Sequence, residues 1–135
     1  YDKIIIATES NGYRLTLGEY NPNSTADESL INLNNGRQFT TMDNNEFTNG
    51  GDVKKSCSYK HSQSGWWFNT EKMKGDCTNA NLNGNYYYLK GTKTNWYDLH
   101  VEKGLGKGVF WICDNVGGNL VSLRDVWMGI YRSED

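Results

Sequence analysis

The sequence predicts one domain of short strands joined by long irregular loops. The length of 135 residues fits a single domain, since domains usually span about 100–200 residues. Hydrophobic residues make up only 36%, yet aromatic residues reach 13%, with five Trp and nine Tyr. A few large rings must therefore supply much of the core. The aromatic-rich middle, residues 66–88, shows no sustained helical period.

The beginning of the chain predicts a β-hairpin. Residues 4–6 are three consecutive isoleucines, a β-branched run typical of a strand. Residues 13–17 alternate apolar and polar side chains. Between the two runs stands Asn11-Gly12, a dipeptide that favours the tight type I′ turn of hairpins.

Long loops are predicted for residues 21–51, which are rich in Asn, Gly, Asp, Ser and Thr. Residues 30–33 and 38–41 interrupt this stretch and are interpreted as short strands. Further along, residues 109–112 predict a strand, and residues 120–130 predict another whose alternation changes phase across Arg124-Asp125. A β-bulge there would reconcile the two phases.

Composition excludes several classes of protein. The formal charge is −2, from 14 basic and 16 acidic residues without blocks of one sign, so binding to nucleic acid or to an acidic membrane surface is not expected. No apolar run approaches the roughly 20 residues of a membrane span. Three cysteines lack CxxC spacing and only two histidines are present, which argues against a zinc site.

Several motifs in order resemble the fibrinogen C-terminal domain family. They comprise Phe-Thr-Thr-Met-Asp-Asn at 39–44, a cysteine, Gly-Trp-Trp-Phe-Asn at 65–69, a second cysteine, and Asn-Leu-Asn-Gly-Asn-Tyr-Tyr at 81–87. Gly-Val-Phe-Trp at 108–111 and Val-Ser-Leu-Arg at 121–124, followed by Met128, resemble the last two strands of that family, and residues 13–15 resemble an earlier strand. A double Trp, an Asn-Leu-Asn-Gly turn and two flanking cysteines are improbable together by chance.

The resemblance implies an α+β, fibrinogen C-terminal-like fold in which residues 1–135 form a single partial domain. Complete family domains have an N-terminal subdomain, which is expected to be absent from this chain and either supplied by a second chain or missing from an abbreviated domain. The resemblance also implies a disulfide between Cys57 and Cys77. Cys113 has no family partner, so it is either a small buried hydrophobe or a bridge to another chain.

Family members bind calcium in a loop after the Phe-Ser/Thr-Thr motif. By resemblance, Asp43, Asn45 and Glu46 are the candidate ligands, since calcium takes six to eight oxygens from carboxylates and carbonyls. The two positions where the family places carboxylate ligands appear as Asn45 and, if the loop is shortened, Glu46, so one charge is lost and the spacing is altered, which predicts weak binding. The alternative is an ordinary Asn-rich turn whose side chains bond their own backbone.

Many members bind acetyl groups or peptide ends in a pocket beside the second cysteine. By resemblance, Asp76, Cys77 and Thr78 form its floor, and Trp96 or Tyr97 its stacking wall. Thr78 replaces the family's His, so the family's specificity does not carry over. The alternative for Trp96 and Tyr97 is packing in the core.

The function predicted first is a secreted recognition module of lectin or innate-immune type that binds glycans or acetylated ligands, with avidity from oligomers. Its site would lie in loops 43–52 and 70–78. Asn23, in Asn-Ser-Thr, is an N-glycosylation acceptor that suits an extracellular protein. The competing hypothesis is a structural or cell-adhesion component that pairs with another chain through Cys113 or a strand edge. No catalytic constellation supports an enzyme.

Overall fold

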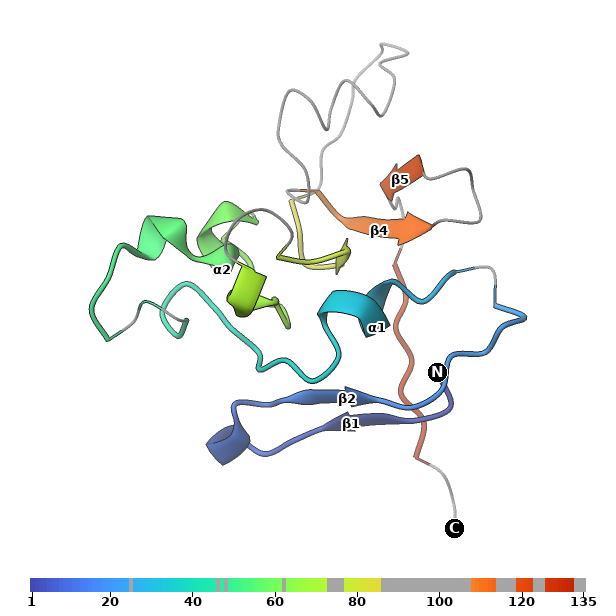
Figure 1. The fold of residues 1–135 in the computed structure, drawn as a ribbon. Helices are drawn as coiled ribbons and strands as arrows, with labels where there is room; N and C mark the ends of the chain where they lie inside the picture. The colour runs from blue at the N-terminus through green and yellow to red at the C-terminus, as the bar shows by residue number, and fades with distance from the viewer. Residues whose placement is uncertain are drawn as a thin grey trace.

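The computed structural model describes residues 1–24, 26–45, 47, 49–61, 63–72, 77–85, 108–113, 119–122 and 126–132. Within them, two small antiparallel sheets and a few short helices are joined by irregular segments (Figure 1). The prediction of short antiparallel strands with long loops is confirmed.

The N-terminal hairpin is present, but its turn differs from the prediction. Strands β1 (Ile4–Ile6) and β2 (Leu15–Leu17) pair antiparallel, with Ile4 opposite Leu17. The predicted two-residue turn at Asn11-Gly12 is wrong, because Glu9–Asn11 form a 3-10 turn, η1, before the chain reverses. Gly12 then takes a φ of 61°, which glycine adopts without strain.

The interpretation of residues 30–33 as a strand is wrong. Helix α1 (Ser29–Leu33) forms there and buries both Leu30 and Leu33. Residues three positions apart share one face of a helix but lie on opposite faces of a strand, so burial of both leucines favours the helix. In the second predicted strand, residues 38–41, only Thr40 makes a bridge, to Trp66.

Two short helical turns place the first cysteine. Asp52 caps the 3-10 turn η2 (Val53–Lys55) by accepting from the Lys54 N–H, and Ser56 caps α2 (Cys57–Lys60) by accepting from the Tyr59 N–H. Cys57, at the start of α2, forms the predicted disulfide with Cys77 across 20 residues, with a Cα–Cα distance of 5.8 Å.

The second sheet combines β3 (Ala80–Asn81), β4 (Phe110–Cys113) and β5 (Asn119–Ser122) in that order. Strand β4 confirms the strand predicted at residues 109–112. Strand β5 confirms the first half of the strand predicted at residues 120–130. The second half is wrong, because residues 126–132 have no regular secondary structure. The Trp111 indole of β4 donates to the Ala26 carbonyl, which links this sheet to the segment before α1.

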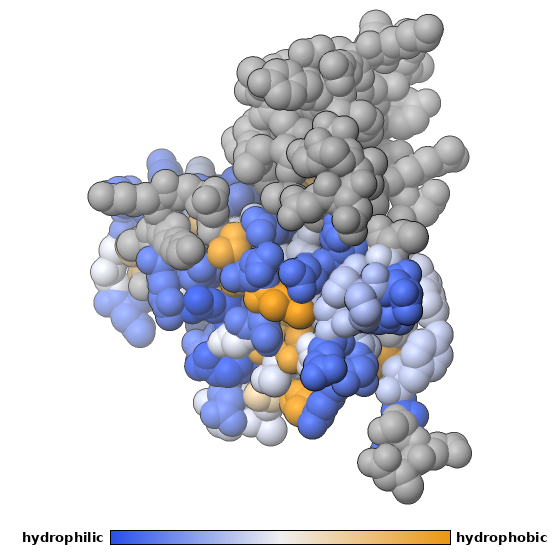
Figure 2. Space-filling model, turned by 45° about the vertical axis from the view of Figure 1, so that its right-hand side comes forward, coloured by the Kyte–Doolittle hydropathy of each residue, from blue (hydrophilic) through white to orange (hydrophobic). Residues whose placement is uncertain are grey.

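The core lies around the disulfide, between the hairpin and the second sheet. Large rings dominate it, as the composition predicts: the side chains of Trp66, Phe68 and Phe110 are almost wholly buried. Leu15 and Leu17 of β2 and Leu30 of α1 complete the cluster with both cysteines. On the face drawn in Figure 2, the remaining apolar surface is divided into small patches among hydrophilic residues.

Tyr1 packs on this core, and its phenol is expected to make the folded chain less stable in alkali. Burial raises the pKa of its phenol to about 12, with smaller contributions from Glu28 and Tyr20, while the Leu30 backbone lowers it. Between about pH 10 and pH 12 the unfolded chain loses this proton and the folded chain keeps it, so stability falls as pH rises. Denaturant midpoints near pH 9 and pH 11 should show a smaller fall for Tyr1→Phe than for the wild type.

Exposed Tyr131 provides the control for this effect. The denaturant midpoint of Tyr131→Phe should fall between about pH 9 and pH 11 as much as that of the wild type. An equal fall in Tyr1→Phe and the wild type would show that Tyr1 makes no such contribution.

Candidate functional site

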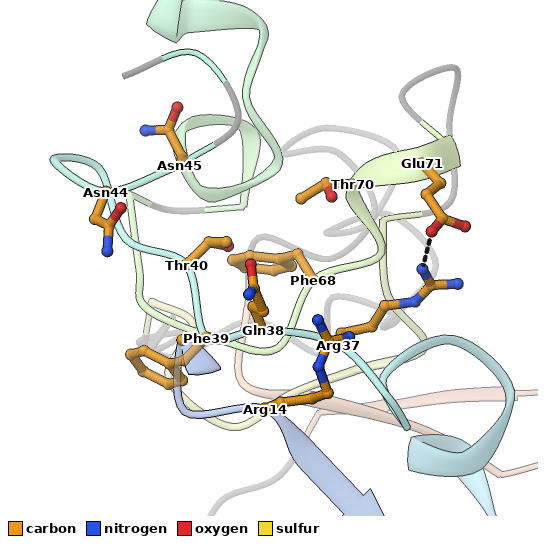
Figure 3. A pocket seen from close by; sticks show the side chains of 11 residues that line it. Arg14, Arg37, Gln38, Phe39, Thr40, Asn44, Asn45, Phe68, Thr70 and Glu71 are labelled. Atoms are coloured by element: carbon orange, nitrogen blue, oxygen red, sulfur yellow. Dashed lines mark ion pairs between the residues drawn. The ribbon is translucent and has the colours of Figure 1, made fainter. Parts of the chain in front are cut away.

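A polar pocket of about 300 Å³ lies where three segments of the chain meet (Figure 3). Its lining comes from the hairpin turn, from residues 37–45 and from residues 68–71, which include the start of the 3-10 turn η3 (Thr70–Lys72). The lining residues are Gly12, Arg14, Arg37, Gln38, Phe39, Thr40, Asn44, Asn45, Phe68, Thr70 and Glu71. This volume stands at the small end of ligand pockets, which span roughly 300–1,000 Å³.

Backbone pairing holds the first two segments together. The Leu15 N–H donates to the Arg37 carbonyl at 2.9 Å, and the Phe39 N–H donates to the Gly12 carbonyl at 2.9 Å. Residues 36–39 therefore run beside the hairpin at the edge of β2 that β1 does not occupy. A Cβ on Gly12 would lie 2.8 Å from the Gln38 side chain, so glycine lets this pocket wall approach closely.

The third segment joins through the core. The Thr40 and Trp66 backbones exchange hydrogen bonds at 3.0 and 3.1 Å, and the Asn69 N–H donates to the Cys77 carbonyl at 2.7 Å. Phe68, which lies between Trp66 and Asn69 in the sequence, lines the pocket and stacks on His61, with 5.4 Å between ring centroids. Hydrogen bonds and ring packing next to the disulfide therefore position this side of the pocket.

Charge in the pocket is unbalanced. Arg14 and Arg37 both line it, against one carboxylate, Glu71. The Arg37 Nη1 lies 2.7 Å from the Glu71 Oε1, and the Arg14 Nη1 donates to the Gly36 carbonyl at 2.5 Å. The Arg37 Nε is buried and has no acceptor within the described part of the chain.

The predicted calcium residues form a loop that bonds largely to itself. The Asn45 amide nitrogen donates to the carbonyls of Thr41 and Met42, and its Oδ1 accepts from the Phe47 N–H at 2.9 Å. The Thr41 hydroxyl donates to the Asp43 Oδ1 at 2.7 Å and holds the pKa of that carboxyl below its usual value.

These bonds occupy oxygens that a calcium ion would need. Across residues 41–45 the side chains supply one carboxylate, that of Asp43, whereas calcium takes six to eight oxygens from carboxylates, carbonyls and water. Glu46 lies outside the described residues. No group of three His, Cys, Asp or Glu side chains suited to a metal occurs within the part of the chain that the structure describes. The described donors therefore fit calcium poorly by themselves.

Of the residues predicted to bind a ligand, the structure describes only Cys77 and Thr78. Cys77 and Thr78 are buried, with exposed fractions of 1% and 4%. The Thr78 hydroxyl accepts from the Asn34 amide at 2.8 Å and donates to the Ala80 carbonyl at 2.5 Å, so its hydrogen-bonding capacity is used inside the fold. Asp76, Trp96 and Tyr97 lie outside the described residues, as does the side chain of Cys113.

The structure does bring together the two loops predicted to form the site. Asn44 and Asn45 from the first loop and Thr70 and Glu71 from the second line the same pocket. Sequence reasoning missed Arg14, Arg37 and Gln38. The available signals were two cations: Arg14 within the predicted hairpin strand and Arg37 just before the Phe-Thr-Thr motif. Neither position predicts that the two side chains meet.

Comparisons with known proteins identify the family of the chain. The sequence model of the family "Fibrinogen beta and gamma chains, C-terminal globular domain" matches residues 1–132. The chain belongs to this family. Its domains are non-enzymatic binding domains, so the expectation that the chain is not an enzyme is confirmed.

Among its relatives, the chain is 31% identical to the fibrinogen beta chain of Petromyzon marinus over 89% of its length, and 33% identical to fibroleukin of Bos taurus over 98%. It spans about a quarter of the length of each relative, 25% and 24%. The fibrinogen-like globe domain of human ANGPTL6 superposes with a TM-score of 0.53 at 28% identity, over 82% of this chain and 40% of that one. These matches confirm the fibrinogen-like globe fold.

Proposed function

We propose that this chain is part of a secreted recognition protein of lectin or innate-immune type that binds glycans or acetylated surface ligands in the described pocket. The observation that carries the proposal is the convergence of loops 43–52 and 70–78 on one cavity. Phe39 and Phe68 line the cavity beside residues that carry hydroxyl and amide groups, and such a mixture of apolar and polar lining suits a sugar.

Other features support an extracellular location. The buried Cys57–Cys77 disulfide is typical of oxidising compartments. Asn23 lies in an exposed turn, where its N–H donates to the Asn21 side chain, and this position would leave a glycan in solvent. No described helix is long and apolar enough to cross a membrane.

A glycan array tests this function. The intact parent protein is applied to acetylated and plain glycans, once with calcium and once with a chelator. Binding to any glycan supports the proposal, and loss of binding with chelator would support the weak calcium site that the sequence predicts at Asp43, Asn45 and Glu46. A blank array under both conditions would contradict recognition of glycans.

The second candidate function is protein–protein adhesion within a multichain assembly. Large apolar side chains are exposed on β1 and on residues 126–131: Ile5, Ile6, Val126, Trp127, Met128, Ile130 and Tyr131. The Trp127 side chain alone is 80% exposed. The Trp127 and Tyr131 rings contact each other, with 6.3 Å between centroids, and exposed apolar side chains that gather in this way can mark a protein interface.

The oligomeric state tests this alternative. Under the adhesion proposal, the parent protein forms a complex by light scattering, and Trp127→Ser shifts it toward the smaller species. A disulfide-linked complex that Cys113→Ser abolishes would support the interchain proposal for that cysteine. Monomers at all concentrations, with or without reductant, would contradict self-association.

A further inference from the structure

We propose that the pocket recognises a carboxylate-bearing sugar, with Arg14 and Arg37 as the residues that hold the carboxylate. The inference rests on the proposed glycan-binding function and adds the chemical class of the ligand. It depends on charge, on the anchoring of the two guanidinium groups and on the remaining lining.

The two arginines are positioned by the fold rather than by each other. The Arg37 carbonyl accepts from the Leu15 N–H, so the backbones that bear the two side chains lie in adjacent segments. Figure 3 shows both side chains along the same wall of the pocket. The Gly36 carbonyl holds one Arg14 nitrogen, and the remaining N–H groups of this guanidinium have no acceptor among the described residues. A planar guanidinium with free N–H groups matches a carboxylate in a bidentate manner.

Glu71 does not neutralise this wall. Its side chain is 74% exposed, whereas that of Arg37 is only 27% exposed, so their ion pair lies near solvent and is weak. One glutamate faces two arginines in the lining, which leaves a net positive charge. Because the whole chain is formally −2, the positive charge is a local property of this pocket.

The unsatisfied N–H donor of Arg37 also favours binding of a carboxylate. Its Nε is buried and has no acceptor among the described residues, and an unsatisfied buried donor destabilises the free protein. A carboxylate that enters the pocket would supply an acceptor after a small rotation of the side chain. Binding would then offset a cost that the free protein carries.

The remaining lining favours a sugar acid over a simple anion. Thr40, Thr70 and Asn44 line the cavity together with Phe68, whereas the Phe39 ring is turned toward Trp67. These groups match the hydroxyls and ring faces of a monosaccharide. The small volume admits one such unit rather than an extended polymer.

Calorimetric titration of the intact chain with methyl glucuronide and with methyl glucoside tests the inference, since the two differ in the carboxylate. We expect the glucuronide to bind about tenfold to a hundredfold more tightly, in line with a charged hydrogen bond. Arg14→Gln should abolish the preference, and Arg14→Lys should restore only part of it, because the bidentate fork is lost. Glu71→Gln should strengthen glucuronide binding by removing the competing carboxylate.

Arg132→Gln is the matched control, because Arg132 is an exposed cation outside the pocket lining. It should leave the preference unchanged, and near-ultraviolet circular dichroism should show that every variant is folded. Equal affinity for both sugars, or a preference that survives Arg14→Gln, overturns the inference and leaves glycan recognition standing. Binding of neither sugar also overturns it, and a blank glycan array then shows that the proposed function fails as well.

Discussion

Gly84→Ala is expected to be among the most destabilising single substitutions in the chain. A Cβ at Gly84 would overlap the carbonyl group of Gly108 and approach the Val109 nitrogen. These atoms are all backbone, so no side-chain rotation can relieve the overlap. Asn85 bridges Gly108 here, next to the β3–β4 pairing, and the two segments would have to separate. We expect a loss of about 3 kcal/mol or more, at the upper end of overpacking effects.

Denaturant unfolding followed by tryptophan fluorescence measures this loss. Gly36→Ala is the matched control, because Gly36 has a φ of 76° but no atom lies within 4 Å of the place that its Cβ would take. Only its left-handed backbone should cost stability there, about 1 kcal/mol. A Gly84→Ala midpoint equal to that of Gly36→Ala would show that the two backbones are not packed so closely.

Removal of the disulfide is the second large expected effect. Cys57 and Cys77 are fully buried in the cluster that contains Trp66 and Phe68. Their bridge closes a loop across 20 residues, and in the loop-entropy model it contributes roughly 3 kcal/mol. The double variant Cys57→Ala, Cys77→Ala also leaves space in this cluster. We therefore expect a loss of about 3–5 kcal/mol.

Guanidinium unfolding with and without reductant separates the bridge from other effects. The wild type should lose stability on reduction, whereas the double variant should be insensitive to reductant. Cys113→Ala keeps the bridge and should retain the wild-type response to reductant. If the double variant were as stable as the wild type, the bridge would not be a major source of stability.

Local patterns predicted the parts of the fold that depend on local physics. Three isoleucines facing an alternating run were sufficient for the β1–β2 pair, because burial of one sheet face requires that period. Residues 30–33 were different, because their composition also suits a strand. The helix is favoured because Leu30 and Leu33 are both buried, and this burial depends on the neighbouring segments. The same limit applies to residues 126–130, whose alternating apolar pattern is not matched by a strand.

Sequence motifs alone predicted the family and, through it, the disulfide, because the double Trp, the Asn-Leu-Asn-Gly turn and the two cysteines occur in a fixed order along the chain. Only the tertiary structure showed that Thr78 is committed to Asn34 inside the fold and that Arg14 and Arg37 share a pocket wall. The pocket joins segments as far apart as Gly12 and Glu71. Contacts at such separation leave no local periodicity, because backbone pairing and the packed rings around the disulfide create them.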